Sequence, residues 1–212
     1  PKVWNEKGYE VPETWDEMLA LSDQMVEDGY TPWAIGIESS GATGWVATDW
    51  VEDIMLRIHP PEVYDQWVAG ELPFNSPEVK EAIGYMEEIW FNEDYVLGGR
   101  EGIVLTPFGD AITPLTVDPP AAILHRQANF IAGFLPEGGD EIGETVGFFY
   151  LPTIDESLGR PVLGAGDLFG AFTDRPEVRA AMRWFSTGDS ARGWIEAGGF
   201  ASPHQDAELS WY

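Results

Sequence analysis

The sequence predicts an α/β fold that is rich in helix. Several segments place apolar residues at helical spacing between recognisable start and stop residues. Short apolar runs bounded by Gly or Pro separate these segments, as is typical of buried strands. Helices that alternate with short strands along the chain are characteristic of α/β proteins.

The first strongly predicted helix starts at Thr14. Thr14 and Glu17 have capping-box spacing, in which each residue satisfies a backbone N–H of the other. Gly29 is a natural stop. One face of this helix is apolar at helical spacing, and its members are Trp15, Met18, Leu19, Met25 and Val26. The run TPWAIGI, residues 31–37, then predicts a short strand.

A glycine-rich stretch, GATGWVATDW at residues 41–50, leads into the next predicted helix, which covers residues 46 to 58. Val46, Trp50 and Ile54 lie on one side of it, and Arg57 is a candidate for the same side. HPP ends this helix. The adjacent acids Glu52 and Asp53 are expected on a solvated face.

The remaining elements follow from the same signals. Ser76 as N-cap and Pro77 at the first helical position predict a helix as far as Trp90, with a shorter helix before it at 62–69. Pro176 opens another helix. The other segments are expected as loop at 95–122, strand or turn running into a short helix at 121–134, buried strand at 144–152, extended chain at 159–172 and a last short helix within 189–199.

Composition and charge limit the classes of function. The 212 residues carry 37 Asp and Glu against 11 Lys and Arg, a net charge of −26. Nucleic acids and anionic membrane surfaces need a basic face, so neither is expected as a partner. Without cysteine, neither disulfides nor thiolate metal sites form. No apolar run approaches the roughly 20 residues of a membrane-spanning helix.

The residues of known catalytic motifs are missing from the sequence. The three histidines are far apart and form no H-x-x-x-H or H-E-x-x-H pattern, and GAGDLFG at 164–170 lacks the spacing of a dinucleotide loop. Acidic residues are so frequent that pairs arise by chance. A hydrolase that uses a carboxylate pair stays open as an alternative, with Asp49 and Asp167 as the candidates.

Four segments, in order, resemble extracellular solute-binding proteins of ABC sugar importers, most closely the α-glucoside-binding type. They are VPETWDEMLALSDQMVEDGYTPWAIGI, LPFNSPEVKEAIGYMEEIW, FFYLPTIDESLGRPVLGAGDLFGAF and RPEVRAAMRWFSTGDSARGWIEAGGFASPHQDA. The third contains an aromatic-Pro strand that leads to a glycine-rich element similar to the family's GGGD pattern. The resemblance covers nearly the whole chain.

The resemblance implies a lobe of a periplasmic-binding-protein-like (type II) fold that lacks most of the N-terminal lobe. Residues 1–163 would form the second lobe, 164–188 would cross back to the first, and 189–212 would return to the second. The start PKVWNEKGYEVPETW is typical of the middle of a domain, so we expect a piece of a longer protein. Exposed strand edges would favour self-association of such a piece.

The resemblance also implies a site for a sugar, which offers an apolar C–H face and a rim of hydroxyls. Trp45 would cover the face, with Gly44 allowing a close approach of the backbone, although burial of Trp45 in a core is the alternative; Trp50 is expected in the core. His125 is a further candidate donor to the rim. The predicted ligand-binding residues are Trp45, Gly44, Asp49, Arg126, Gln127, Asn129, Phe130, Gly166 and Asp167. Trp33, Trp67, Trp90, Trp184 and Trp194 are expected in the core.

The resemblance therefore implies the substrate-binding component of an ABC-type carbohydrate importer, most similar to those for α-glucosides or oligosaccharides. Its partners would be a small sugar and the membrane subunits of a permease, and no cofactor, metal or catalytic residue is expected. It would be periplasmic or extracellular, either lipid-anchored or soluble. A carbohydrate-active hydrolase and an interaction fragment without a ligand are the alternatives.

Overall fold

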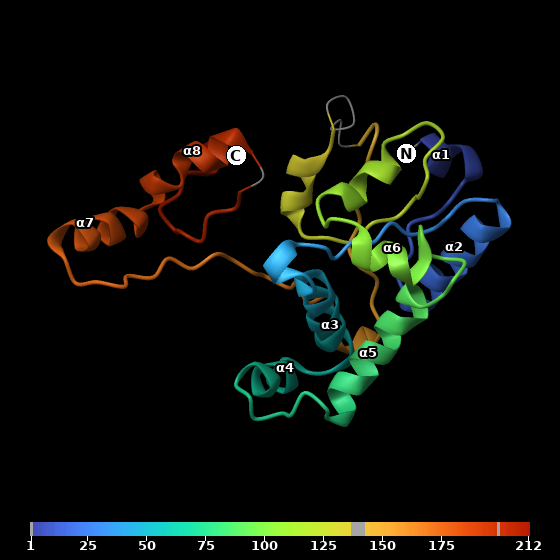
Figure 1. Ribbon diagram of the computed structural model, residues 1–212, viewed down its shortest axis with the longest axis horizontal. Helices are drawn as coiled ribbons and strands as arrows, with labels where there is room; N and C mark the ends of the chain where they lie inside the picture. The colour runs from blue at the N-terminus through green and yellow to red at the C-terminus, as the bar shows by residue number, and fades with distance from the viewer. Residues whose placement is uncertain (1, 137–142, 199) are drawn as a thin grey trace. The chain divides into compact units, whose positions relative to one another are not determined.

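The computed structural model describes residues 2–136, 143–198 and 200–212 (Figure 1). The chain divides into two compact units. The first unit comprises Pro1–Gln127 and Phe134–Leu163, and the second comprises Ala128–Gly133 and Gly164–Tyr212. The first unit holds nearly all of the buried apolar side chains.

The described elements are helices joined by extended segments. The first unit contains α1 (Lys2–Lys7), α2 (Trp15–Glu27), α3 (Trp45–Ile58), α4 (Pro61–Val68), α5 (Pro77–Trp90) and α6 (Gly99–Leu105), with short 3-10 turns at Ser40–Ala42, Asp110–Leu115 and Glu156–Leu158. The second contains α7 (Pro176–Phe185), α8 (Arg192–Ala197) and 3-10 turns at Gly188–Ser190 and Leu209–Trp211; a further turn spans Asn129–Phe134. The predicted helices are confirmed, whereas α6 lies in a stretch that the sequence predicted as loop.

Local side-chain contacts explain where the helices begin. The Thr14 hydroxyl accepts from the backbone N–H of Glu17 at 3.3 Å, and the Glu17 carboxylate accepts from the backbone N–H of Thr14 at 3.2 Å. The predicted capping box at the start of α2 is therefore confirmed. At α5, Ser76 accepts from the backbone N–H of Val79 and Pro77 occupies the first turn, as predicted.

The predicted strand at 31–37 is an extended segment with parallel partners on both sides. Trp33 forms parallel bridges with Val96 and with Leu124, and Glu38 forms one with Pro107. Parallel pairing is what an α/β arrangement requires. The described residues contain only isolated bridges rather than continuous ladders.

The predicted buried strand at 144–152 is wrong. Phe148 is 86% exposed, and Thr153 forms only an isolated bridge with Thr14. Two carbonyls at the end of this segment, those of Leu151 and Pro152, accept hydrogen bonds from the Arg57 side chain instead of from a neighbouring strand. A side chain on α3 therefore replaces part of the expected ladder.

Three indole rings stand at the centre of the first unit. The rings of Trp33 and Trp50 meet edge to face at 5.7 Å between centroids, and those of Trp50 and Trp90 meet at 5.8 Å. All three residues are buried, as the sequence predicted. The helix α3 packs against α5 beside them (Figure 1). The Trp33 indole N–H donates to the Ser22 hydroxyl at 3.0 Å, which satisfies one polar atom of this core.

The second unit buries few side chains. Leu168 is 97% exposed and Phe172 98% exposed. Trp184 and Trp194 are each 54% exposed, so the prediction that they belong to a core is wrong. The reason is the small size of this unit, in which the aromatic contacts are pairs at the surface, such as Phe169 stacked on Phe185 at 4.6 Å. The predicted passage of 164–188 and 189–212 between lobes stays a prediction.

Candidate functional site

The candidate site in the first unit is built on one face of α3. The helix starts at Gly44, whose φ of 107° is in the left-handed region, a conformation that side chains with a Cβ rarely adopt. Residues spaced by four lie above one another on a helix. Trp45, Asp49, Asp53 and Arg57 therefore form one row along α3.

The aromatic end of this row is Trp45. Its ring is partly buried and meets the ring of Phe108 edge to face at 5.2 Å, and Phe108 meets Phe134 in the same way at 5.3 Å. Trp45 thus belongs to an aromatic cluster and, as a partly buried residue, also packs against the core of the first unit. Trp50, one turn further, is completely buried, as predicted.

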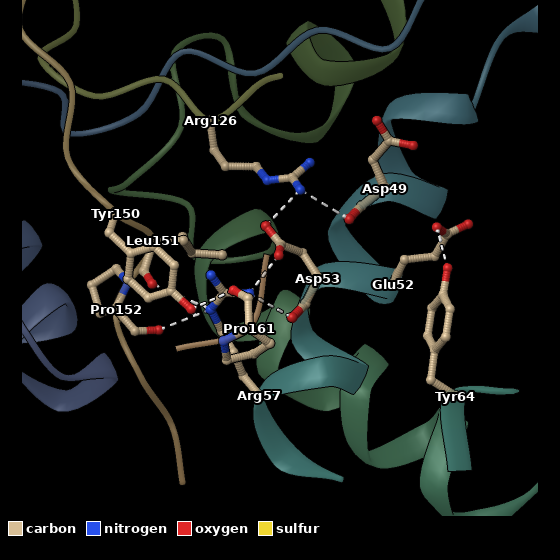
Figure 2. A network of polar contacts seen from close by, with 10 residues as sticks. All are labelled: Asp49, Glu52, Asp53, Arg57, Tyr64, Arg126, Tyr150, Leu151, Pro152 and Pro161. Atoms are coloured by element: carbon tan, nitrogen blue, oxygen red, sulfur yellow. Dashed lines mark hydrogen bonds and ion pairs between the residues drawn. The ribbon is translucent and has the colours of Figure 1, made fainter. Parts of the chain in front are cut away.

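A buried carboxylate joins two arginines in the middle of the row (Figure 2). One oxygen of Asp53 accepts from Nη2 of Arg126 at 2.7 Å, and the other accepts from Nη1 of Arg57. The same Nη2 of Arg126 donates to the backbone carbonyl of Asp49 at 3.1 Å. The side chains of Asp53 and Arg57 are 10% and 3% exposed, so both charges lie in the interior.

Arg57 fixes this network to the rest of the first unit. Its Nε donates to the carbonyls of Leu151 and Pro152, both at 3.2 Å, and its guanidinium lies 4.7 Å from the centre of the Tyr150 ring. The Tyr150 hydroxyl in turn donates to the carbonyl of Pro161 (Figure 2). Residues 150–161 are thereby held against α3.

The prediction that Asp53 lies on a solvated face is wrong, because its carboxylate is buried between two arginines. A signal was available: Asp53 stands four residues before Arg57, on the side of the helix that was expected to be apolar. Its second partner, Arg126, is 73 residues away in the chain and gave no local signal.

Asp49 and Arg126 stand side by side with unused hydrogen-bonding capacity. Nη1 of Arg126 is buried and has no partner among the described residues. The carboxylate of Asp49 accepts no hydrogen bond from the residues that the structure describes, and burial raises its pKa, while the charge of Arg126 opposes the shift. Figure 2 shows Nη1 turned away from Asp53. A donor and an acceptor are thus both available at this end of the row.

His125 precedes Arg126 and contacts the extended segment at residues 31–37. Its Nδ1 is 2.8 Å from the carbonyl of Ala34, which fixes Nδ1 as the protonated nitrogen. Burial lowers the pKa of His125, and the neighbouring Arg126 lowers it further. Nε2 is buried without a partner in the described part of the chain. The imidazole is therefore neutral and connects residue 125 to the central extended segment.

The structure divides the predicted site residues between the two units. Gly44, Trp45, Asp49, Arg126 and Gln127 belong to the first unit. The other four predicted residues belong to the second unit, where Phe130 is partly buried and the rest are exposed; they are Asn129, Phe130, Gly166 and Asp167. Within the first unit, Arg126 and Asp49 contact each other directly.

The described residues hold neither a metal cluster nor a membrane-spanning helix. No group of three or more His, Asp or Glu side chains there could hold a metal ion. Within the same ranges, no helix combines the length and the apolar character that crossing a membrane requires.

Two relatives match along this whole chain. It is 48% identical over 212 residues to the osmoprotective compounds-binding protein GgtB of Synechocystis sp., of which it covers 50%. It is 42% identical over 217 positions to the alpha-glucosides-binding periplasmic protein AglE of Rhizobium meliloti, of which it covers 46%. The chain therefore spans about half the length of the curated relatives that it matches.

Solved structures of solute receptors share this fold. RafE from Streptococcus pneumoniae superimposes with a TM-score of 0.65 at 20% identity over 98% of this chain and 52% of its own, and RafE in complex with raffinose gives 0.63 over 98% and 53%. The bacterial solute receptor AcbH, described as preferring β-D-galactopyranose exclusively, gives 0.61 at 25% identity over 75% of this chain and 37% of its own. The predicted type II solute-binding fold is confirmed.

The sequence pattern of one protein family matches residues 1–188. The family consists of solute-binding proteins, which confirms the prediction of a binding protein rather than an enzyme. The alternative of a hydrolase that pairs Asp49 with Asp167 gains no support from it. The chain belongs to the bacterial extracellular solute-binding protein family.

Proposed function

We propose that the protein carrying this chain is the substrate-binding component of an ABC-type importer for a small carbohydrate of the α-glucoside class. The observation that carries the proposal is the pair formed by Asp49 and Arg126 beside Trp45 on α3. Family membership and the names of the relatives support it.

The chemistry of a sugar hydroxyl fits this pair. A hydroxyl donates one hydrogen bond and accepts others. It can accept from Nη1 of Arg126 and donate to the carboxylate of Asp49, both of which have capacity to spare. Bonds to charged groups are stronger than those between neutral groups. The ring of Trp45, one turn before Asp49, supplies an apolar surface for the C–H face of the sugar.

Further contacts are part of the proposal. Gln127 follows Arg126 directly and offers an amide to the sugar rim. In the second unit, Asn129 and Asp167 are exposed polar side chains and Phe130 is partly buried; ligand contacts of these residues stay predictions. Gly166 precedes Asp167 and leaves the backbone open to a ligand.

The sugar class and the location come from the relatives. AglE is named for alpha-glucosides and GgtB for osmoprotective compounds, so a small α-linked glucoside is the class proposed here. We place the protein in the periplasm or outside the cell, either lipid-anchored or soluble, where its partners are the membrane subunits of a permease.

Calorimetry tests the proposal. The protein expressed from the complete reading frame that encodes this chain is titrated with maltose, trehalose, sucrose and raffinose. We expect saturable binding of at least one α-glucoside, weakened by about 1 to 3 kcal/mol in Trp45→Ala, the range of aromatic anchors at binding sites. Phe74→Ala, which truncates an aromatic side chain that is 65% exposed and lies elsewhere in the first unit, is the matched control. The absence of heat from every sugar would refute the proposal.

A further inference from the structure

We propose that Asp53 is a positioning residue for sugar binding, because its carboxylate fixes the Arg126 guanidinium with Nη1 held ready for a ligand oxygen. This inference rests on the proposed function. The side chain of Asp53 is only 10% exposed, so we expect it to act on a ligand through Arg126 and not by direct contact.

Three contacts restrain the guanidinium of Arg126. Nη2 donates to Asp53 at 2.7 Å and to the backbone carbonyl of Asp49 at 3.1 Å, and the group lies 5.7 Å from the centre of the Trp50 ring. Nη2 of Arg126 therefore donates both hydrogen bonds to acceptors on α3. A free arginine side chain loses about 2 kcal/mol of rotamer entropy when it is ordered. Here the fold has already ordered it, which favours binding by preorganisation.

The carboxylate of Asp53 is itself held from the opposite side. Its other oxygen accepts from Nη1 of Arg57, which also donates to the Asp53 backbone carbonyl at 2.9 Å. Arg57 is anchored by the carbonyls of Leu151 and Pro152. Asp53 thus links Arg126 to Arg57, which is anchored in the first unit (Figure 2).

The two arginines on this carboxylate differ in a way that points to a ligand. Arg57 directs Nε and Nη1 to protein acceptors. Arg126 leaves Nη1 buried with no partner in the described ranges. A buried donor without an acceptor is destabilising, so a ligand oxygen that accepts from Nη1 would stabilise the complex.

The network holds two guanidinium groups and two carboxylates, so its charges balance and a neutral hydroxyl is the ligand group that fits it. Two guanidinium groups share the single carboxylate of Asp53. The neighbouring Asp49 carboxylate supplies the second negative charge of the row and remains available to accept a hydroxyl proton in a hydrogen bond. A sugar hydroxyl satisfies both requirements, since it accepts from Arg126 and donates to Asp49.

A double-mutant cycle on the complete protein tests the inference. The affinity for the tightest-binding sugar among maltose, trehalose, sucrose and raffinose is measured for wild type, Asp53→Asn, Arg126→Lys and the double variant. We expect about tenfold weaker binding in Asp53→Asn, the scale of one lost hydrogen bond to a charged group. Since both changes act on the one contact between Asp53 and Arg126, their effects should not add, and the double variant should bind like Arg126→Lys alone. Glu52→Gln, which changes an acid of α3 that faces Tyr64, is the charge-matched control and should bind like wild type.

A set of monodeoxy analogues separates positioning from a general loss of structure. The analogue that lacks the hydroxyl held by Arg126 should bind wild type and Asp53→Asn with equal affinity, whereas the other analogues should keep the difference. Equal weakening for every analogue, or wild-type affinity in Asp53→Asn, would overturn the inference. If Asp53→Asn does not fold, Asp53→Glu keeps the charge and displaces it by one methylene; wild-type affinity in that variant would also overturn it.

The two proposals fail in different ways. If wild type binds none of the four sugars, the proposed function fails, and the inference fails with it. If wild type binds a sugar and the Asp53 variants bind it equally well, only the inference fails.

Discussion

The two units use aromatic residues in opposite ways. The first unit buries Trp33, Trp50 and Trp90 edge to face in one core. The second leaves Trp184 and Trp194 more than half exposed. Trp50 and Trp90 lie in the helices α3 and α5, and Trp184 and Trp194 lie in the helices α7 and α8. Spacing therefore determines which face of a helix is apolar, whereas burial depends on what packs against that face.

The ion pairs of the two units differ in the same way. Asp53 and Arg57 on α3 are buried, and they also contact Arg126 and Leu151, which belong to two other segments of the first unit. Asp174 and Arg179 are 74% and 61% exposed and form an isolated pair. Removing one partner of an interior pair leaves an uncompensated buried charge, and removing one partner of an exposed pair leaves a solvated one.

Truncation of Trp50 should give the largest effect on stability. Trp50→Ala removes a completely buried ring that contacts two others, so we expect the free energy of unfolding to fall by about 3 to 5 kcal/mol. Phe172→Ala in the second unit should change it by less than about 0.5 kcal/mol, since that side chain is 98% exposed. Urea unfolding followed by circular dichroism measures both. Similar losses in the two variants would contradict the comparison.

Loss of Arg57 should be the next largest effect. Arg57→Met leaves the Asp53 carboxylate with only Arg126 and frees two buried carbonyls, which should lower the free energy of unfolding by about 3 kcal/mol. Arg179→Met removes the exposed pair and should give no measurable change. Urea unfolding followed by circular dichroism measures the stability of both variants. An unchanged stability in Arg57→Met would show that the network does not hold residues 150–152 to α3.

The pH dependence of stability should reflect His125. Burial lowers the pKa of His125 in the folded state. Below the ordinary histidine pKa of about 6.5, His125 is therefore protonated in the unfolded chain but still neutral in the folded chain. The contribution of His125 is therefore complete above that value and is lost as the pH falls towards the folded pKa. The melting temperature of His125→Gln should decrease less than that of wild type between pH 7.5 and pH 5.5. His204→Gln, in the second unit, is the control, and equal decreases in wild type and His125→Gln would contradict the interpretation.

Exposed apolar side chains of the second unit should affect association rather than stability. We propose that Leu168 and Phe172, almost fully exposed on an extended segment, favour pairing with a second copy of the chain. The variant Leu168→Ser with Phe172→Ser should self-associate less in sedimentation velocity while its urea midpoint stays that of wild type. A wild-type chain that sediments as a monomer at every concentration would refute this proposal.

Elements defined by local signals were predictable. The capping box of α2, the proline start of α5 and the apolar side of α3 all depend on residues within about four positions of one another. The burial of Trp50 followed from the same spacing. The helix α6 was missed because it starts at Gly98 and Gly99, both with positive φ, in a stretch whose glycines indicated a loop.

The centre of the candidate site was not predictable, because its partners are distant in the chain. Arg126 was named as a ligand-binding residue from the resemblance to a family, whereas its contact with Asp53 joins positions 73 residues apart. A run of acids on a helix ordinarily lies in solvent. Only the fold shows that Asp49, Glu52 and Asp53 have three different surroundings: one beside Arg126, one with Tyr64 and one buried between two arginines (Figure 2).

A crystal structure of the complete protein with its tightest-binding α-glucoside tests the central claim most directly. We predict a sugar hydroxyl within about 2.7 to 3.2 Å of Arg126 Nη1, also in contact with the Asp49 carboxylate, while the bond between Asp53 and Arg126 is kept. A sugar bound away from α3, with Nη1 of Arg126 satisfied by a protein acceptor, would contradict it.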